Sequence, residues 1–371
     1  MKRFIFLILT VCLCATITLS GCSCTGDAVL EFNSSKVKNI QAERLTYSVS
    51  LEKNYKDIKR STSLNQNLLP EYKNGVYVAE YQAGVNSPVN HINLSQSESV
   101  INRITTSLTI EVVDNKGTAD TSDDKIYKDQ ILSEVYFYDS SWSYAPIYSK
   151  TTVKNTYVAN DSSRIEYAHK IYQYTATYKK SSYVLTKKYY SPSDGEDITG
   201  DMNLNELDPT KFVAIKGNGS SHEYEFRQVL DNVQLIFATR NLDISKGKSI
   251  VLPVVSYMYS SPSQLQLLNS ANSTKNIDKQ SFNYSVPTYN NFYAESTLSI
   301  PVKNIRITLT NTDYIGLPKY VVVQNGTADE EKINNNALIV EYAEAIVASA
   351  SYNCLGALVY RLNDVSISYN A

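Results

Sequence analysis

Apolar and polar residues alternate along most of the chain from about residue 43 onward, with the period of two that is typical of β-strands. The alternation is clear at Leu108, Ile110 and Val112, and it continues over many residues between Arg164 and Tyr178. Further strand patterns lie at 131–138, 183–190, 249–259, 297–310, 318–324, 338–346 and 357–369. Several of these segments are long for the strands of a sandwich. The pattern therefore predicts a mainly β fold: one large curved antiparallel sheet or half-barrel with one or two short helices.

Residues 231–240 carry the clearest helical pattern of the chain. Asp231 can cap the first turn, and Val233, Leu235, Ile236 and Phe237 can form an apolar side. Residues 191–221 are rich in glycine, proline and acidic residues, so we expect a long connection there that divides the domain into two lobes. Residues 260–290 are rich in Ser, Asn and Gln, and their composition predicts a second long loop.

The amino terminus has the organisation of an export signal. Lys2 and Arg3 precede an almost continuously apolar run over residues 4–18, which is shorter than a bilayer span. Leu19, Ser20, Gly21 and Cys22 follow, and this order resembles the lipobox of bacterial lipoproteins. The resemblance implies cleavage before Cys22 and attachment of diacylglycerol to its thiol, which supplies the two acyl chains that stable anchoring needs. An ordinary secretory signal and an uncleaved anchor are the alternatives.

This interpretation divides the chain into three parts. Residues 1–21 are the signal peptide, residues 22–42 are a flexible polar tether, and residues 43–371 form a β-rich extracytoplasmic domain. The expected location is the outer face of the bacterial cytoplasmic membrane or the cell surface, with the membrane as a partner through lipidated Cys22. Cys24 and Cys354 remain in the exported chain, either as a disulfide or as two free thiols.

Composition excludes some classes of function. The chain has 35 basic and 37 acidic residues and no basic stripe, so nucleic acid is not an expected partner. Tyrosine is abundant, with 30 residues against 9 Phe and 1 Trp. These rings suit either half-buried sheet positions or an aromatic surface that binds sugars or peptides, and the first interpretation is favoured.

Motifs for catalysis, cofactors and metals give no assignment. The three histidines, His91, His169 and His222, are scattered, and the sequence contains neither His-Glu-x-x-His nor Gly-x-Ser-x-Gly nor a phosphate-binding loop. Two acidic loops, at 114–124 and 194–208, do not fit the EF-hand pattern, and another type of calcium loop stays open. We therefore expect no enzyme activity, no cofactor and no metal.

A second resemblance rests on short segments. They lie at 134–139, 145–149, 231–232, 234–235, 240–242 and 246–249. Their order is similar to that of a family of bacterial envelope proteins of unknown function, whose half-barrel is similar to the periplasmic lipoprotein carriers. Over roughly residues 100–365, the resemblance implies a curved sheet with a short helix or loop on its concave side, and it brings no catalytic residue.

Two functions follow as hypotheses. The first is a non-catalytic lipoprotein that binds a ligand or helps to organise the envelope; the alternative is a surface hydrolase acting on cell-wall or host glycans. For the first, we expect an apolar or amphipathic ligand on the concave face, with residues 231–240 lying across it as a plug. The predicted ligand-binding residues are Tyr172, Tyr174, Tyr178, Ile305, Ile307 and Leu309. The competing outcome is a concave face filled by the helix and loops.

Overall fold

The computed structural model describes residues 40–55, 70–85, 101–138, 144–161, 164–179, 181–215, 219–223, 229–241, 244–257, 262–278, 283–285, 297–309, 318–325, 338–348 and 353–369. The predicted signal peptide, Cys22 and Cys24 lie outside these residues, as do the side chains of Leu309 and Cys354. Of the predicted tether, residues 40–42 are described, and they already belong to the first strand.

The described strands belong to a single sheet. They are β1 (Ile40–Glu52), β2 (Glu71–Val85), β3 (Ile101–Asp114), β4 (Lys125–Phe137), β5 (Pro146–Asp161), β6 (Arg164–Tyr178), β7 (Ser182–Tyr190), β8 (Phe212–Ala214), β9 (Ser220–Glu223), β10 (Leu230–Asp231), β11 (Ser249–Val255), β12 (Ser263–Asp278), β13 (Asn283–Ser285), β14 (Thr297–Leu309), β15 (Pro318–Gln324), β16 (Ile339–Ala348) and β17 (Asn353–Tyr369).

The order of strands starts from β1, which pairs with β2 on one side and with β17 on the other. From β2 the sheet continues through β3, β4, β5, β6 and β7, and β8 and β9 both pair with β7. From β17 it continues through β16, β15, β14, β12 and β11 to β10. These pairings are antiparallel, apart from β10 with β11 and β13 with β17. The predicted mainly β fold with a large antiparallel sheet is confirmed.

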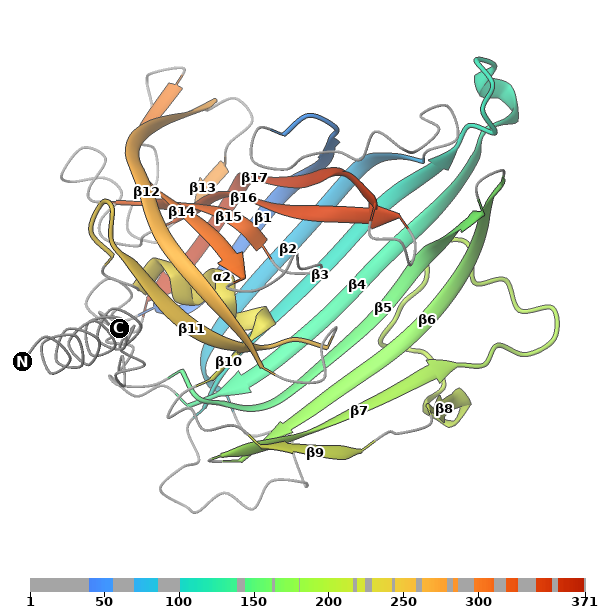
Figure 1. Ribbon diagram of the computed structural model, residues 1–371, viewed down its shortest axis with the longest axis horizontal. Coiled ribbons are helices and arrows are strands. Elements are labelled where there is room, and N and C mark those ends of the chain that lie inside the picture. The colour runs from blue at the N-terminus through green and yellow to red at the C-terminus, as the bar shows by residue number, and fades with distance from the viewer. Residues whose placement is uncertain are drawn as a thin grey trace, which may run out of the picture.

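The sheet curves around the α-helix α2 (Asn232–Asn241), which Figure 1 shows inside the curve. Asp231 caps the helix, because its side chain accepts a hydrogen bond of 2.9 Å from the backbone of Val233. Gln234 completes the cap by accepting from the backbone of Asp231 at 2.9 Å. Leu235, Phe237 and Ala238 are buried, as expected of a helix enclosed on most sides. The helix thus begins one residue after the predicted start, because Asp231 is its cap.

The two faces of the sheet differ in polarity. We call the face that contacts α2 the inner face and the opposite one the outer face. On β1, Leu45, Tyr47 and Val49 are buried on the inner face, while Arg44 and Ser48 alternate with them and point outward. We call the strands from β2 to β9 one arm of the sheet and the strands from β17 back to β10 the other. The main core lies between these two arms, where α2 contacts β3 and β4 of the first and β10, β11, β15 and β16 of the second.

The prediction of a long loop over residues 260–290 is wrong for its first half. Residues 263–278 form β12, which pairs with β11 and along its length with β14. Polar residues such as Gln264, Ser273 and Asn276 are exposed positions of this strand. Leu265, Leu267 and Asn269 are buried on its other face. The composition of this segment suggested a loop, but the alternation of Leu265 and Leu267 with Gln264 and Gln266 is a strand pattern.

The acidic connection after β7 folds back onto the outer face of β4 and β5. The side-chain amide of Gln130 donates to Asp201 and to the carbonyl of Met202, both at 2.8 Å. The ammonium group of Lys154 donates to the carbonyl of Gly200. Since β8 and β9 on either side of residues 215–219 both pair with β7, the connection leads back to the same sheet.

Candidate functional site

One row of apolar side chains crosses the inner face from β2 to β8. Residues paired across antiparallel strands point to the same face, so the register defines the row directly. We call it the inner-face row, and it consists of Tyr77, Leu108, Ile131, Val153, Tyr172, Tyr189 and Val213.

The exposure of this row is highest at its end on β7 and β8. Leu108 is 5% exposed and Val153 is 8% exposed, whereas Tyr189 and Val213 are each 42% exposed. The cause is the shape of the sheet: α2 covers β3 and β4, and β10 and β16 contact β5. The row therefore continues from the core onto β7 and β8 as an accessible apolar strip on the concave side.

Tyr174 lies beside this strip, in the next row of the inner face. Its ring is 6.2 Å from that of Tyr172 and 4.7 Å from that of Tyr257. Burial raises the pKa of Tyr174 to about 12, so its hydroxyl is protonated at neutral pH and can donate a hydrogen bond. The ammonium group of Lys187 lies 5.7 Å from the centre of the Tyr174 ring. The strip thus has the ammonium group of Lys187 and the phenol of Tyr174 at its border.

Tyr178 has a different environment from its neighbours on β6. It is buried, its ring stacks on Tyr183 at 5.9 Å, and its hydroxyl donates to Asp231. Burial raises the pKa of Tyr178 and that of Asp231, which keeps the phenol protonated as a donor. Because Asp231 also caps α2, this contact fastens β6 to the start of the helix.

The remaining predicted ligand-binding residues lie on β14. Ile305 is 0% exposed and Ile307 is 1% exposed, and both belong to the main core. Leu309 pairs with Leu265 of β12 through its backbone. The structure therefore brings Tyr172 and Tyr174 together at the open strip, but it places Tyr178 in a separate buried cluster and the two isoleucines in the core.

The prediction from sequence missed Tyr189, Val213 and Tyr257. Tyr189 lies in a segment whose alternation predicts a strand, so its face could have been assigned. Val213 lies in the three-residue strand β8, and no local pattern distinguishes so short a strand from a loop.

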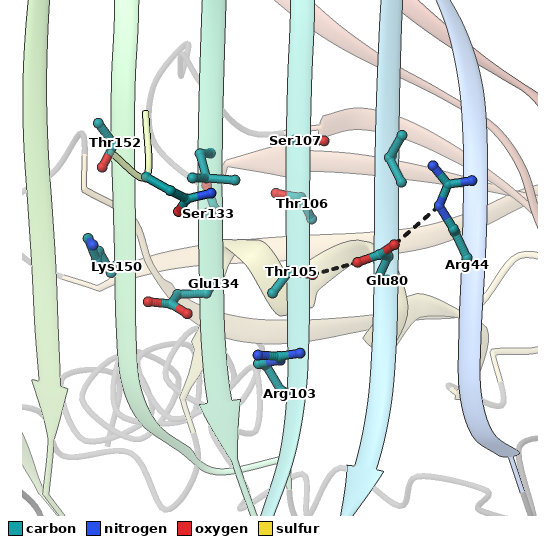
Figure 2. Close-up of a pocket in the computed structure, with 13 residues that line it drawn as sticks. Arg44, Glu80, Arg103, Thr105, Thr106, Ser107, Ser133, Glu134, Lys150 and Thr152 are labelled. Atoms are coloured by element: carbon teal, nitrogen blue, oxygen red, sulfur yellow. Dashed lines mark hydrogen bonds and ion pairs between the residues drawn. The ribbon is translucent and has the colours of Figure 1, made fainter. Parts of the chain in front are cut away.

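A hollow formed by described residues lies on the outer face, away from the inner-face row. It has a volume of about 400 Å³ and crosses β1 to β5, as Figure 2 shows. We call it the outer-face groove. Its lining residues are Arg44, Val78, Glu80, Arg103, Thr105, Thr106, Ser107, Leu132, Ser133, Glu134, Lys150, Thr152 and Asn205. A second hollow of about 190 Å³ extends it toward β17 and shares Arg44, Glu80, Arg103 and Thr105.

Several polar side chains of the groove hold one another in place. Glu80 forms an ion pair of 3.1 Å with Arg44 and accepts a hydrogen bond of 3.4 Å from Thr105. Arg103 donates to Gln82 at 2.9 Å, and Glu134 accepts from the hydroxyl of Tyr136 at 3.1 Å. The groove is therefore a polar surface with side chains of both charges, whereas the inner-face strip is apolar.

Lysine ammonium groups occupy the acidic loop that was considered for calcium. Lys154 donates to the backbone carbonyl groups of Thr199, at 3.5 Å, and Gly200. Lys211 forms an ion pair of 2.7 Å with Glu196 and lowers the pKa of that carboxyl group to about 2. In the part of the chain that the structure describes, no group of three or more His, Cys, Asp and Glu residues is placed to hold a metal ion.

Two of the three histidines are described, and each lies against the sheet. His169 lies 3.2 Å from the hydroxyl of Thr156, and burial lowers its pKa to about 4, so the ring is neutral at neutral pH. His222 stacks on Tyr183, with 5.1 Å between the ring centres. His91 lies outside the described residues.

Comparisons with known proteins give a structural likeness. No family model matches the chain, and no curated protein matches it. The structure is similar to the crystal structure of a β-barrel-like protein of the domain of unknown function DUF1849 from Brucella abortus, with a TM-score of 0.43 and 8% sequence identity. The alignment covers 90% of this chain and 100% of that one. Among the described residues, no helix has the length and apolar character needed to cross a membrane.

Proposed function

We propose that this chain is a lipid-anchored extracytoplasmic protein that binds an apolar or amphipathic ligand without catalysing a reaction. The observation that carries the proposal is the inner-face row, which leaves the core and continues as an accessible strip at Tyr189 and Val213, each 42% exposed. Concave, mostly apolar surfaces are the usual location of small-molecule sites. The location in the envelope rests on the lipobox-like order at Leu19 to Cys22.

The surroundings of the strip favour an amphipathic ligand with an acidic head group. An apolar chain that covers Tyr172, Tyr189 and Val213 removes their exposed surface from water, which stabilises the complex by roughly 25 cal/mol per Å². Lys187 and the protonated hydroxyl of Tyr174 lie at the border of the strip and offer a positive charge and a hydrogen-bond donor. A fatty acid or a similar anionic amphiphile matches both features.

The test is a titration of the purified chain with a fluorescent fatty acid. A charge placed in the strip by Val213→Lys is expected to weaken binding by about tenfold or more, because it must be desolvated under the acyl chain. Val76→Lys is the matched control, since Val76 is 49% exposed on the outer face. Equal affinity of the two variants, or no saturable binding by the unmodified chain, would overturn the proposal.

The anchor is tested separately by Cys22→Ala. This change removes the thiol that would carry diacylglycerol, so the expected result is loss of lipid labelling and release from the membrane fraction. Retention in the membrane with unchanged labelling would show that the lipobox interpretation is wrong.

A surface hydrolase is the second candidate, and one observation favours it. Glu80 and Glu134 lie in the outer-face groove in the same row, separated by Thr105. Two strand spacings of ~4.8 Å place their backbones roughly 10 Å apart, close to the separation of the two carboxyl groups in inverting glycosidases. Glu80 is held in an ion pair with Arg44, which stabilises its carboxylate and disfavours the protonated form that a catalytic acid needs. We therefore prefer binding to hydrolysis as the function. Release of reducing ends from wall glycans, lost in Glu80→Gln and Glu134→Gln, would favour the hydrolase instead.

A further inference from the structure

We propose that the outer-face groove is a second binding site, which recognises an acidic glycan. The site lies on the face of the sheet opposite the inner-face strip, and it extends beyond the proposed function. Its basis is a row of five residues in register across β1 to β5. The row consists of Arg44, Glu80, Thr105, Glu134 and Lys150.

The charges of this row are not all neutralised within the protein. Arg44 and Glu80 pair with each other. Lys150 lies directly across from Glu134 on the neighbouring strand, yet its ammonium group has no hydrogen bond or ion pair with any residue that the structure describes. Arg103 donates from one terminal nitrogen to Gln82. Figure 2 shows Arg103, Glu134 and Lys150 on the same side of the sheet, around the hollow.

The uncharged lining indicates a ligand rich in hydroxyl groups. Thr105, Ser107 and Thr152 carry hydroxyls on the outer face, and the amide of Asn205 closes the groove from the loop after β7. An apolar ligand would remove these groups and three cations from water without replacing their hydrogen bonds, which is costly. A saccharide hydroxyl can donate to and accept from the protein hydroxyls and the amide, and it can accept from the cations.

The charge pattern indicates that the saccharide carries separated carboxylate groups. Guanidinium and ammonium groups form their strongest hydrogen bonds with carboxylate or phosphate oxygens. Glu134 lies between Arg103 and Lys150 in the groove and repels a compact, highly charged anion, while it can accept hydrogen bonds from hydroxyls. A uronic-acid oligosaccharide, in which hydroxyls separate the carboxylates, fits this alternation better than inorganic phosphate.

The experiment is a calorimetric titration of the full chain in detergent with hexagalacturonate. Maltohexaose serves as the neutral ligand of equal length, and inorganic phosphate serves as the simple anion. We expect saturable binding of hexagalacturonate that weakens at high salt, and weaker binding of the other two. Lys150→Gln and Arg103→Gln are each expected to weaken it about five- to tenfold, as loss of one charge-assisted contact.

Two further variants control for surface charge and for misfolding. Lys188→Gln makes the same charge change on the same face, since Lys188 follows Thr152 and Gln173 in the neighbouring row, outside the groove. Its affinity should be unchanged. Glu134→Gln removes the repelling charge and keeps an acceptor, so it should tighten binding about two- to threefold, a direction that damage to the fold cannot produce.

Several outcomes would overturn the proposal. They are absence of saturable binding, equal affinity for maltohexaose, equal affinity for phosphate, and equal weakening by Lys188→Gln and Lys150→Gln. Val213→Lys should leave glycan binding unchanged, since Val213 lies on the inner face. A loss of glycan binding in that variant would contradict two separate sites, whatever the result with the fatty acid.

Discussion

The ion pair between Arg240 of α2 and Glu43 of β1 fastens the helix to the sheet inside the core. The two side chains are 2% and 0% exposed, respectively. The guanidinium of Arg240 also lies 5.0 Å from the centre of the Phe237 ring. Within the described residues, Nε of Arg240 and Oε1 of Glu43 have no hydrogen-bond partner. The pair is thus fully removed from water but only partly satisfied.

This geometry predicts a large difference between single and double substitutions. Arg240→Met leaves the carboxylate of Glu43 buried and unpaired, and such a loss costs roughly 3–5 kcal/mol of unfolding free energy. Replacing both residues, with Arg240→Met and Glu43→Leu together, removes both desolvation costs and both unpaired atoms. The double variant should therefore lie within about 1 kcal/mol of the unmodified protein, or above it.

Thermal and urea unfolding of the four proteins measure the effect as a double-mutant cycle. With an unfolding entropy of roughly 2.1 cal/mol/K per residue over ~330 residues, Arg240→Met lowers the melting temperature by about 4–7 °C. The coupling between the two sites should be of the same size as the single loss. If the losses of the two single variants simply add in the double variant, the ion pair does not fasten the helix, and the reasoning is refuted.

Two further predictions concern the titratable side chains of Lys154 and Glu344. Lys154→Met removes the ammonium group that binds the carbonyls of Thr199 and Gly200, so limited proteolysis should cut residues 196–206 faster. The exposed control Lys125→Met should leave the cleavage rate unchanged. Equal cleavage rates in the two variants would contradict this role of Lys154. Burial raises the pKa of Glu344 from 4.5 to about 7, so the folded protein holds this proton between those values and the unfolded chain releases it. Stability should then fall as pH rises through that window, and Glu344→Gln should remove a loss of about 2–3 kcal/mol between pH 5 and pH 8, measured from urea unfolding at the two pH values. The same pH dependence in both proteins would show that Glu344 does not titrate in this way.

The elements that were predicted correctly are those with a local cause. The alternation at Leu108, Ile110 and Val112 reflects one buried face of β3, and these three residues are indeed buried. The helix was located because Asp231 is a capping residue directly before an apolar stretch, and Asp231 does cap α2. Both patterns involve residues that are close together in the sequence, so they can be recognised without knowledge of the fold.

The pairing of distant strands could not be predicted in this way. β17 pairs with the whole length of β1, from Ile40 with Tyr369 to Glu52 with Ala357, although the two strands lie at opposite ends of the described chain. Alternation predicts which side chains of a strand share a face, but it does not predict which strand pairs with it. The same limit explains why Ile305 was expected beside Tyr172: both have the correct periodicity, but β14 belongs to the arm that encloses the core.

Lys150 and Lys154 show how topology decides between two roles for one residue type. They lie four residues apart on the same face of β5, and the local sequence does not distinguish them. The connection after β7 folds over this face and encloses Lys154, which is 0% exposed and serves as the internal cation of an acidic loop. The same connection places Asn205 at the border of the outer-face groove and leaves Lys150 partly exposed there. The ammonium group of Lys154 is already bound by backbone carbonyls of this connection, so it is poorly placed to bind a ligand. Lys150 is not bound in this way and is therefore the stronger candidate for a ligand-binding lysine.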